Sequence, residues 1–252
     1  MFVISVANNK GGVGKTTTTL NTGAALAARE LRVLLVDLDP QASLTIYLGF
    51  DPTDFEHNTY HIMTRRADTL PTIVRTEIPY LDLLPASIDL AGAELEITHM
   101  MGREYILSEQ LATVADLYDV VLIDNMPSLG VLTVNSLMAS DFVLVPIEPT
   151  YLAYKGLEMI NTTIGEVQRY NPRLKLLGTV ITMVDERTKH AKDIMAKIRD
   201  NYPVLGPPIR RSIRFADAAM AGQDISAFAG EQFEGSVAFD AIARDIVARF
   251  PD

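Results

Sequence analysis

A glycine-rich segment near the start of the chain, Lys10-Gly-Gly-Val-Gly-Lys-Thr-Thr17, constrains the possible folds more than any other feature. It follows an apolar run at residues 2–7 that is typical of a buried strand, and it leads into helical periodicity at residues 16–29. Glycines let backbone N–H groups converge on one point, and the first turn of a helix adds the positive end of its dipole. The order strand, loop, helix therefore predicts an α/β fold whose loop binds phosphate.

The end of this loop fits the pattern G-x-x-x-x-G-K-[ST] through Gly14, Lys15 and Thr16, whereas Asn9 and Lys10 stand where that pattern usually begins. We expect Lys15 to contact the β- and γ-phosphates and the Thr16 hydroxyl to bind Mg²⁺. One nucleotide does not need a second lysine, so one explanation of Lys10 is that it reaches a phosphate bound by a second subunit. The residues predicted to bind the nucleotide are Lys10, Gly11, Gly12, Val13, Gly14, Lys15, Thr16 and Thr17.

Length and composition limit the classes of protein that fit. With 252 residues, 48% of them hydrophobic, the chain can form one large α/β domain or two small ones. The absence of cysteine excludes disulfide frameworks, thiol catalysis and iron–sulfur clusters. No apolar run approaches the ~20 residues that cross a bilayer, and residues 2–7 resemble a strand rather than a secretory signal. We therefore expect a soluble, cytoplasmic protein.

Short apolar runs alternate with helical patterns over the whole chain. The predicted strands are residues 2–7, 32–36, 80–84, 119–123, 142–146 and 175–182. The predicted helices are residues 16–29, 91–99, 104–115, 152–170, 189–200 and 237–250. This alternation predicts a doubly wound, mostly parallel β-sheet with helices on both faces. No linker divides the chain, so we expect residues 1–252 to form a single domain, with an irregular insertion at residues 51–79.

Three aspartates follow predicted strands. Asp37 and Asp39 come after the second strand, and Asp124 directly follows residues 120–123. The carboxyl edge of an open α/β sheet is where nucleotides bind, and phosphoryl transfer to water needs groups that hold Mg²⁺ and orient the water. A single aspartate in such a place is most often a helix cap or turn residue. Several of them beside a phosphate loop favour a functional role.

Several motifs together resemble one family. They are the loop at residues 10–17, Val-Leu-Leu-Val-Asp-Leu-Asp-Pro-Gln at 33–41, Val-Leu-Ile-Asp-Asn-Met-Pro-Ser at 121–128, Leu177-Gly178, Thr182-Met183 and Arg211-Ser-Ile-Arg214. In this order they resemble the ParA/Soj branch of the ParA/MinD family of deviant P-loop ATPases. The resemblance covers most of the chain, except for residues 51–79. The family usually has two prolines before the serine of the third motif, where this chain has Met126-Pro127.

The resemblance implies ATP and Mg²⁺ as cofactors and an ATP-dependent sandwich homodimer. It implies that Lys10 crosses to the nucleotide of the other subunit and that Asp39 positions the attacking water. The predicted catalytic residues are therefore Lys10, Lys15 and Asp39. The predicted metal-site residues are Thr16, Asp37 and Asp124, with Asp37 also supporting the loop hydroxyls and Asp124 holding magnesium through water.

The charge of the chain is unevenly distributed. The net charge is −10, but residues 187–214 carry eight basic and two acidic residues, which gives +6 for this segment and −16 for the rest. Such a run is often only a solvated helix face. The resemblance implies non-specific DNA binding by the nucleotide-bound dimer through Arg187, Arg211 and Arg214. The usual Pro-Ser pair and later lysine after Arg214 are replaced here by Ala219, Met220 and Gln223.

The resemblance implies a slow, partner-stimulated ATP hydrolase that partitions or positions a cargo, either a plasmid or chromosome or a protein body. The resemblance implies a ParB-like adaptor as the partner and association with the nucleoid. The alternative is a MinD-like membrane-surface ATPase, but the C-terminal tail lacks the basic face and bulky apolar residues of a membrane anchor. We therefore expect DNA rather than a membrane as the surface on which the protein acts.

Overall fold

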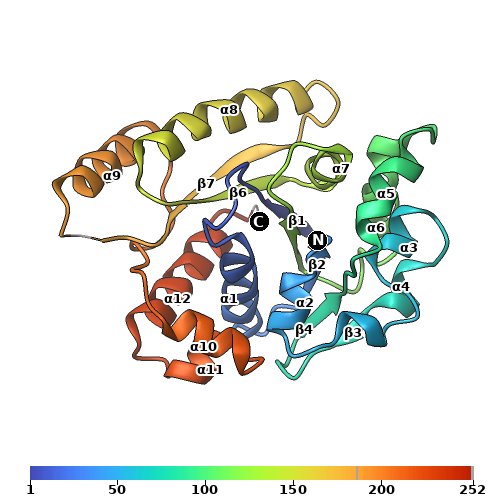
Figure 1. The fold of residues 1–252 in the computed structure, drawn as a ribbon, viewed down its shortest axis with the longest axis horizontal. Coiled ribbons are helices and arrows are strands. Elements are labelled where there is room, and N and C mark those ends of the chain that lie inside the picture. Colours follow the sequence, from blue (N-terminus) through green and yellow to red (C-terminus); the bar gives the residue numbers. More distant parts are fainter. Residues whose placement is uncertain (186, 251–252) are drawn as a thin grey trace.

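A computed structural model describes residues 1–185 and 187–250. These residues form a seven-stranded sheet in the order β3-β4-β2-β5-β1-β6-β7 (Figure 1). All neighbouring strands are parallel except β3 and β4, which are antiparallel. The strands are β1 (Phe2–Val6), β2 (Val33–Leu38), β3 (Val74–Arg75), β4 (Leu81–Leu84), β5 (Val120–Asn125), β6 (Phe142–Ile147) and β7 (Lys175–Ile181). The predicted doubly wound, mostly parallel sheet is confirmed.

Helices cover both faces of this sheet (Figure 1). The longer helices are α1 (Lys15–Ala27), α5 (Leu90–Ile97), α7 (Val131–Ala139), α8 (Tyr151–Val167), α9 (Lys189–Asn201) and α12 (Glu234–Val247). The shorter ones are α2 (Ser43–Tyr47), α3 (Thr59–Met63), α4 (Thr69–Thr72), α6 (Ile106–Ala112), α10 (Arg214–Met220) and α11 (Ile225–Ala229). Two 3₁₀ turns, at Pro52–Asp54 and Arg103–Tyr105, complete the helical elements of the described chain.

Alternate residues of each central strand pack on opposite faces of the sheet. On one face, Ile4 and Leu122 join a core formed with α1 and α12. On the other face, Val3 and Val121 contribute to a core formed with α5 and α6, and Val143 to one formed with α7, α8 and α9. Because both faces of the sheet are covered, the central strands are continuous apolar runs in the sequence. Their positions could therefore be predicted well.

The prediction for residues 51–79 was wrong in part. The segment contains the turn at Pro52–Asp54, the helices α3 and α4, and the strand β3, which pairs antiparallel with β4 at the edge of the sheet. The sequence also gave no prediction for α2, α7, α10 or α11. Each of these elements has nine residues or fewer, too short for helical periodicity to stand out from its surroundings.

Close contacts constrain the sheet at two places. Gly178 in β7 has a φ of +155° and lies where the pairing of β6 with β7 shifts register. Its missing side chain leaves room for the carbonyl of Pro203, which would lie 2.8 Å from a Cβ atom. At the amino edge of the sheet, the ring of Phe2 stacks on that of Phe250 with centroids 4.2 Å apart.

Candidate nucleotide site

The loop between β1 and α1 has the geometry of a phosphate cradle. Gly12 and Gly14 adopt φ values of +69° and +86°, a left-handed conformation that favours glycine. Between them Val13 is fully buried, and its carbonyl accepts a hydrogen bond of 2.8 Å from the hydroxyl of Thr182 at the end of β7. Gly14 occupies the N-cap of α1 without any side-chain cap, so the first N–H groups of the helix remain available to an anion.

Lys15, the first residue of α1, is buried within this loop. Its ammonium donates one hydrogen bond of 3.3 Å to the carbonyl of Lys10. Burial lowers the pKa of Lys15, and the nearby carboxylates of Asp124 and Asp39 act in the opposite direction. A desolvated cation with a single long hydrogen bond is well suited to bind phosphate oxygens.

The two buried aspartates lie side by side on neighbouring strands, because Asp37 of β2 and Asp124 of β5 are paired in register. Asp37 is fully buried and accepts hydrogen bonds from the backbone and hydroxyl of Thr45, at 2.9 and 2.8 Å. It also accepts one of 3.2 Å from the backbone N–H of Asp39. Burial raises the pKa of Asp37 to about 6. These contacts anchor the start of α2 and the turn at Asp39.

Asp124 has fewer partners. One of its oxygens accepts a hydrogen bond of 3.3 Å from the hydroxyl of Thr19, and the other, Oδ2, is buried with no hydrogen-bond partner in the described part of the chain. Burial, with the charge of Asp37, raises the pKa of Asp124 to about 8, while the Thr16 hydroxyl and Lys15 oppose this rise. A buried carboxylate oxygen without a partner next to a hydroxyl supplies the oxygen ligands that Mg²⁺ prefers. The residues present therefore fit a magnesium ion.

Asp39 stands at a turn after β2 and is only partly buried. Its Oδ1 accepts a hydrogen bond of 2.9 Å from the backbone N–H of Gln41, and its carbonyl accepts one of 2.8 Å from Ala42. These bonds fix the backbone of the turn and leave the carboxylate accessible from the carboxyl edge of the sheet. This is the position that a group orienting a water molecule requires.

The side chain of Lys10 lies outside the cradle and contacts a residue of the same chain. Its ammonium forms an ion pair of 2.8 Å with Oε2 of Glu148, the residue after β6. The other oxygen of Glu148 lies 3.4 Å from the guanidinium of Arg211. The sequence gave no role to Glu148, because a single acidic residue after a strand carries no motif.

A cavity of about 100 Å³ adjoins the loop next to Gly14 and Thr17. Its other walls include Met183, Arg210 and Phe239. The sequence did not single out these walls, because they come from distant segments of the chain. The Thr182-Met183 motif forms part of this lining, and the sequence assigned it no contact with a nucleotide.

The predicted DNA-binding arginines are all exposed, and two of them lie near the same carboxylate. Arg187 forms an ion pair of 2.6 Å with Asp185, and its hydrogen bonds, with a smaller contribution from Arg211, lower the pKa of Asp185 to about 2. Arg214, the first residue of α10, lies over the ring of Phe233 at 5.0 Å. The fold therefore brings Arg187 and Arg211 together, and Arg211 reaches Glu148 beside the nucleotide loop.

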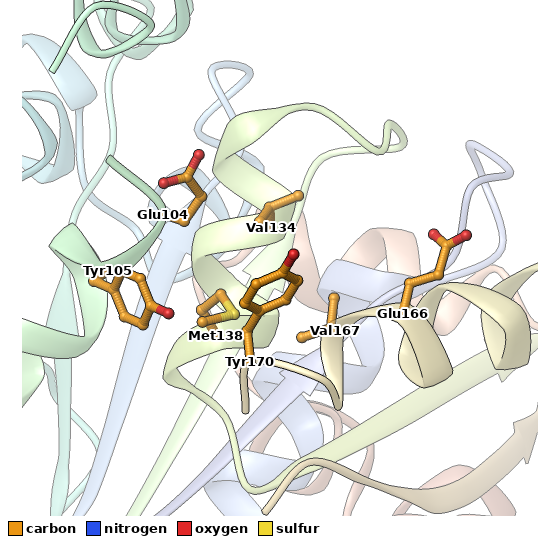
Figure 2. A pocket seen from close by; sticks show the side chains of 7 residues that line it. All are labelled: Glu104, Tyr105, Val134, Met138, Glu166, Val167 and Tyr170. Carbon is orange, nitrogen blue, oxygen red and sulfur yellow. The ribbon is translucent and has the colours of Figure 1, made fainter. Parts of the chain in front are cut away.

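A larger groove, of about 450 Å³, lies elsewhere, between α7 and the end of α8. Figure 2 shows Val134 and Met138 at its floor, with Tyr105 and Tyr170 beside them. None of the predicted site residues lines it, so size alone does not identify the nucleotide site.

Comparisons with known proteins agree with this geometry. A family model described as an AAA domain, AAA_31, matches residues 1–176. The chain is 38% identical to the sporulation initiation inhibitor protein Soj of Bacillus subtilis, over 98% of both chains. It is also 38% identical to the chromosome partitioning protein ParA of Caulobacter vibrioides, over 99% of this chain and 95% of that one.

Among solved structures, the chain resembles one named cobyrinic acid a,c-diamide synthase from Mycobacterium smegmatis, with bound ADP and magnesium. The identity is 41% and the TM-score 0.86, over 98% of this chain and 94% of that one. The phosphate cradle, the paired buried aspartates and these relatives lead to one assignment. The chain belongs to the ParA/Soj-like partitioning ATPases of the ParA/MinD family of P-loop ATPases.

Proposed function

We propose that this protein is an ATP-dependent dimerising switch that binds DNA without sequence preference and positions a cargo. The observation that carries the proposal is the pair of lysines on one loop. Lys15 is buried inside the cradle, where one nucleotide needs it, and Lys10 stands outside, half exposed. A second subunit facing this edge would bring its own triphosphate within reach of Lys10.

ATP would occupy the loop from Lys10 to Thr17, with its base in the cavity beside Thr17 and Met183. Lys15 and the N–H groups at the start of α1 would hold the phosphates. Thr16 and Asp124 would hold magnesium, with Asp37 fixing the neighbouring turn rather than using its occupied oxygens as ligands. Magnesium supplies charge neutralisation of the phosphate oxygens when bound.

Hydrolysis would depend on Asp39, and replacing it with alanine tests this role. We expect Asp39→Ala to lower ATP hydrolysis by at least about ten-fold, because the carboxylate that orients the water is lost. Nucleotide binding should remain and the ATP-bound dimer should accumulate. Phosphate release and sedimentation velocity measure the two quantities. Loss of nucleotide binding in this variant would instead assign Asp39 to the binding of ATP.

The DNA surface would consist of Arg187, Arg211 and Arg214 with the exposed basic face of α9. Contacts of these side chains with phosphates carry no base information and weaken steeply with salt. Dimerisation would double the number of such contacts on one assembly. This arrangement supports binding by the dimer in preference to the monomer, in spite of the acidic remainder of the chain.

Because Arg187 pairs with Asp185, substitutions of these two residues should change the affinity for DNA in opposite directions. Arg187→Glu should weaken the binding of arbitrary duplex DNA and reduce the salt slope by about one for each arginine removed. Asp185→Asn should strengthen binding, because it frees Arg187 from its internal partner. Asp68→Asn, an exposed residue far along the chain, changes the net charge equally and is the control. Electrophoretic shifts with ATP or ADP measure the effects, and unchanged affinity in Arg187→Glu would remove this residue from the surface.

We further propose that a ParB-like adaptor on the cargo stimulates hydrolysis, so that the protein cycles on the nucleoid in the cytoplasm. The cargo is a plasmid, a chromosome or a protein body. The decisive experiment mixes the protein with ATP, ADP or a non-cleavable analogue and measures mass and DNA binding together. A monomer under saturating analogue would overturn the proposed function.

Two other functions have specific observations for or against them. The MinD-like alternative needs a free amphipathic helix, but Phe239, Ile242 and Ile246 of α12 are buried against α1 and the sheet. Among the described residues no helix is both long and apolar enough to span a membrane. The second candidate is cobyrinic acid a,c-diamide synthase activity, which the name of the similar mycobacterial structure favours. Against it, this activity would give no role to Lys10 or to the exposed arginines Arg187, Arg211 and Arg214. ATP-dependent conversion of cobyrinic acid by the purified protein would establish that activity.

A further inference from the structure

Glu148 is the acidic residue on which two cations of the site converge. Its Oε2 lies 2.8 Å from the ammonium of Lys10, and its Oε1 lies 3.4 Å from the guanidinium of Arg211. Its own side chain is 24% exposed, whereas Lys10 and Arg211 are 49% and 70% exposed. The carboxylate is therefore the fixed member of the group, and the two cations are the members that can leave.

The backbone is arranged so that Lys10 begins within reach of this carboxylate. The side chain of Asn8 is buried and bridges the two segments. It donates a hydrogen bond of 2.7 Å to the carbonyl of Pro146 in β6 and accepts one of 3.0 Å from the backbone N–H of Lys10. Asn8 thus ties the start of the nucleotide loop to the end of β6, two residues before Glu148.

We propose that Glu148 is a positioning residue that holds Lys10 in its own subunit until a second nucleotide-bound copy competes for it. The inference rests on the proposed dimer, in which Lys10 contacts the partner's nucleotide. Because one ammonium cannot serve both sites, release from Glu148 is a cost of dimerisation. The charge of a triphosphate exceeds that of one carboxylate, so the exchange is favourable when ATP is bound.

Because Lys10 and Arg211 share the carboxylate of Glu148, loss of Arg211 and loss of Glu148 should change the hold on Lys10 in opposite directions. Removing the charge of Arg211 leaves Glu148 with Lys10 alone and strengthens that ion pair. Removing the charge of Glu148 frees Lys10. A residue that only maintained the fold would not give opposite effects in these two variants.

The first measurement uses the full chain without nucleotide and follows acylation of the Lys10 amine by mass spectrometry. We expect Glu148→Gln to raise the rate of Lys10 labelling by about two- to five-fold, the range for loss of a partly exposed ion pair. Arg211→Gln should lower it. The control is Glu109→Gln, which breaks the remote ion pair with Arg65 by the same substitution. Labelling of other lysines should not change in any variant.

The second measurement is the dissociation constant of the dimer with a non-cleavable ATP analogue, which Glu148→Gln should lower by about the same factor. Glu148→Asp, which keeps the charge, should restore part of the wild-type behaviour. Equal Lys10 labelling in wild type and Glu148→Gln overturns the inference, whatever the dimer does. Faster labelling with an unchanged dimer constant also overturns it. Faster labelling without a dimer in either protein overturns the proposed function and leaves only the ion pair established.

Discussion

Replacement of Lys15 by methionine should lower ATP hydrolysis by about 10²–10³-fold, the range for loss of a charge-stabilising donor in a closed site. Among the residues that the structure describes, Lys15 forms no ion pair and one hydrogen bond, to the carbonyl of Lys10. The ammonium therefore contributes little to the fold, and its burial is itself unfavourable, as the lowered pKa indicates. Methionine retains the length of the side chain and removes the charge.

Steady-state phosphate release at saturating ATP measures this loss, and thermal unfolding without nucleotide serves as the second readout. We expect the unfolding temperature of Lys15→Met to equal or exceed that of the wild type. Lys175→Met, at the exposed start of β7, is the matched control and should leave both quantities unchanged. Hydrolysis within a few-fold of wild type in Lys15→Met would remove this lysine from the catalytic machinery.

Gly178→Ala should lower the free energy of unfolding by about 2–4 kcal/mol, because a strained backbone and an overpacked contact coincide there. The φ of +155° is one that residues with side chains rarely adopt, and the new Cβ would lie 2.8 Å from the carbonyl of Pro203. The flexible Leu205 side chain can move away from it, but the backbone carbonyl cannot do so without disturbing the link between β7 and residues 203–205.

Gly165→Ala, on the exposed face of α8 near its C-terminal end, is the matched control for this substitution. A Cβ atom there would meet nothing within 4 Å, and alanine favours the helix, so stability should rise by about 0.5–1 kcal/mol. Urea unfolding of both variants without nucleotide gives the two values. A Gly178→Ala protein as stable as Gly165→Ala would contradict the packing of β6 and β7 described above.

The sequence predicted those parts of the fold in which neighbouring residues carry the signal. Strands buried on both faces, such as Val120–Asn125, appear as apolar runs, and α1 and α9 show clear periodicity. The edge strand β3 has two residues and pairs with β4, so nothing in its own sequence distinguishes it from a loop. Element boundaries and short helices depend on packing partners that are distant in the chain.

The same distinction holds for the site. Motifs placed Lys15, Asp39 and Asp124 at one edge of the sheet, and the structure brings them together there. The side-chain partners could not be predicted from the sequence. Asp37 accepts hydrogen bonds from Thr45 at one oxygen and from the backbone N–H of Asp39 at the other, and Lys10 pairs with Glu148, which is 138 residues away. Such contacts depend on the crossing order of the strands rather than on any local pattern.

The stacked rings of Phe2 and Phe250 fasten the beginning of the central strand to the segment after the last helix. Phe2 is the first residue of β1, so the stacked rings lie at the amino edge of the sheet, whereas the phosphate loop follows the carboxyl end of β1. Because the stacked rings lie away from the phosphate loop, loss of either ring would loosen this junction without removing a residue of the predicted nucleotide site.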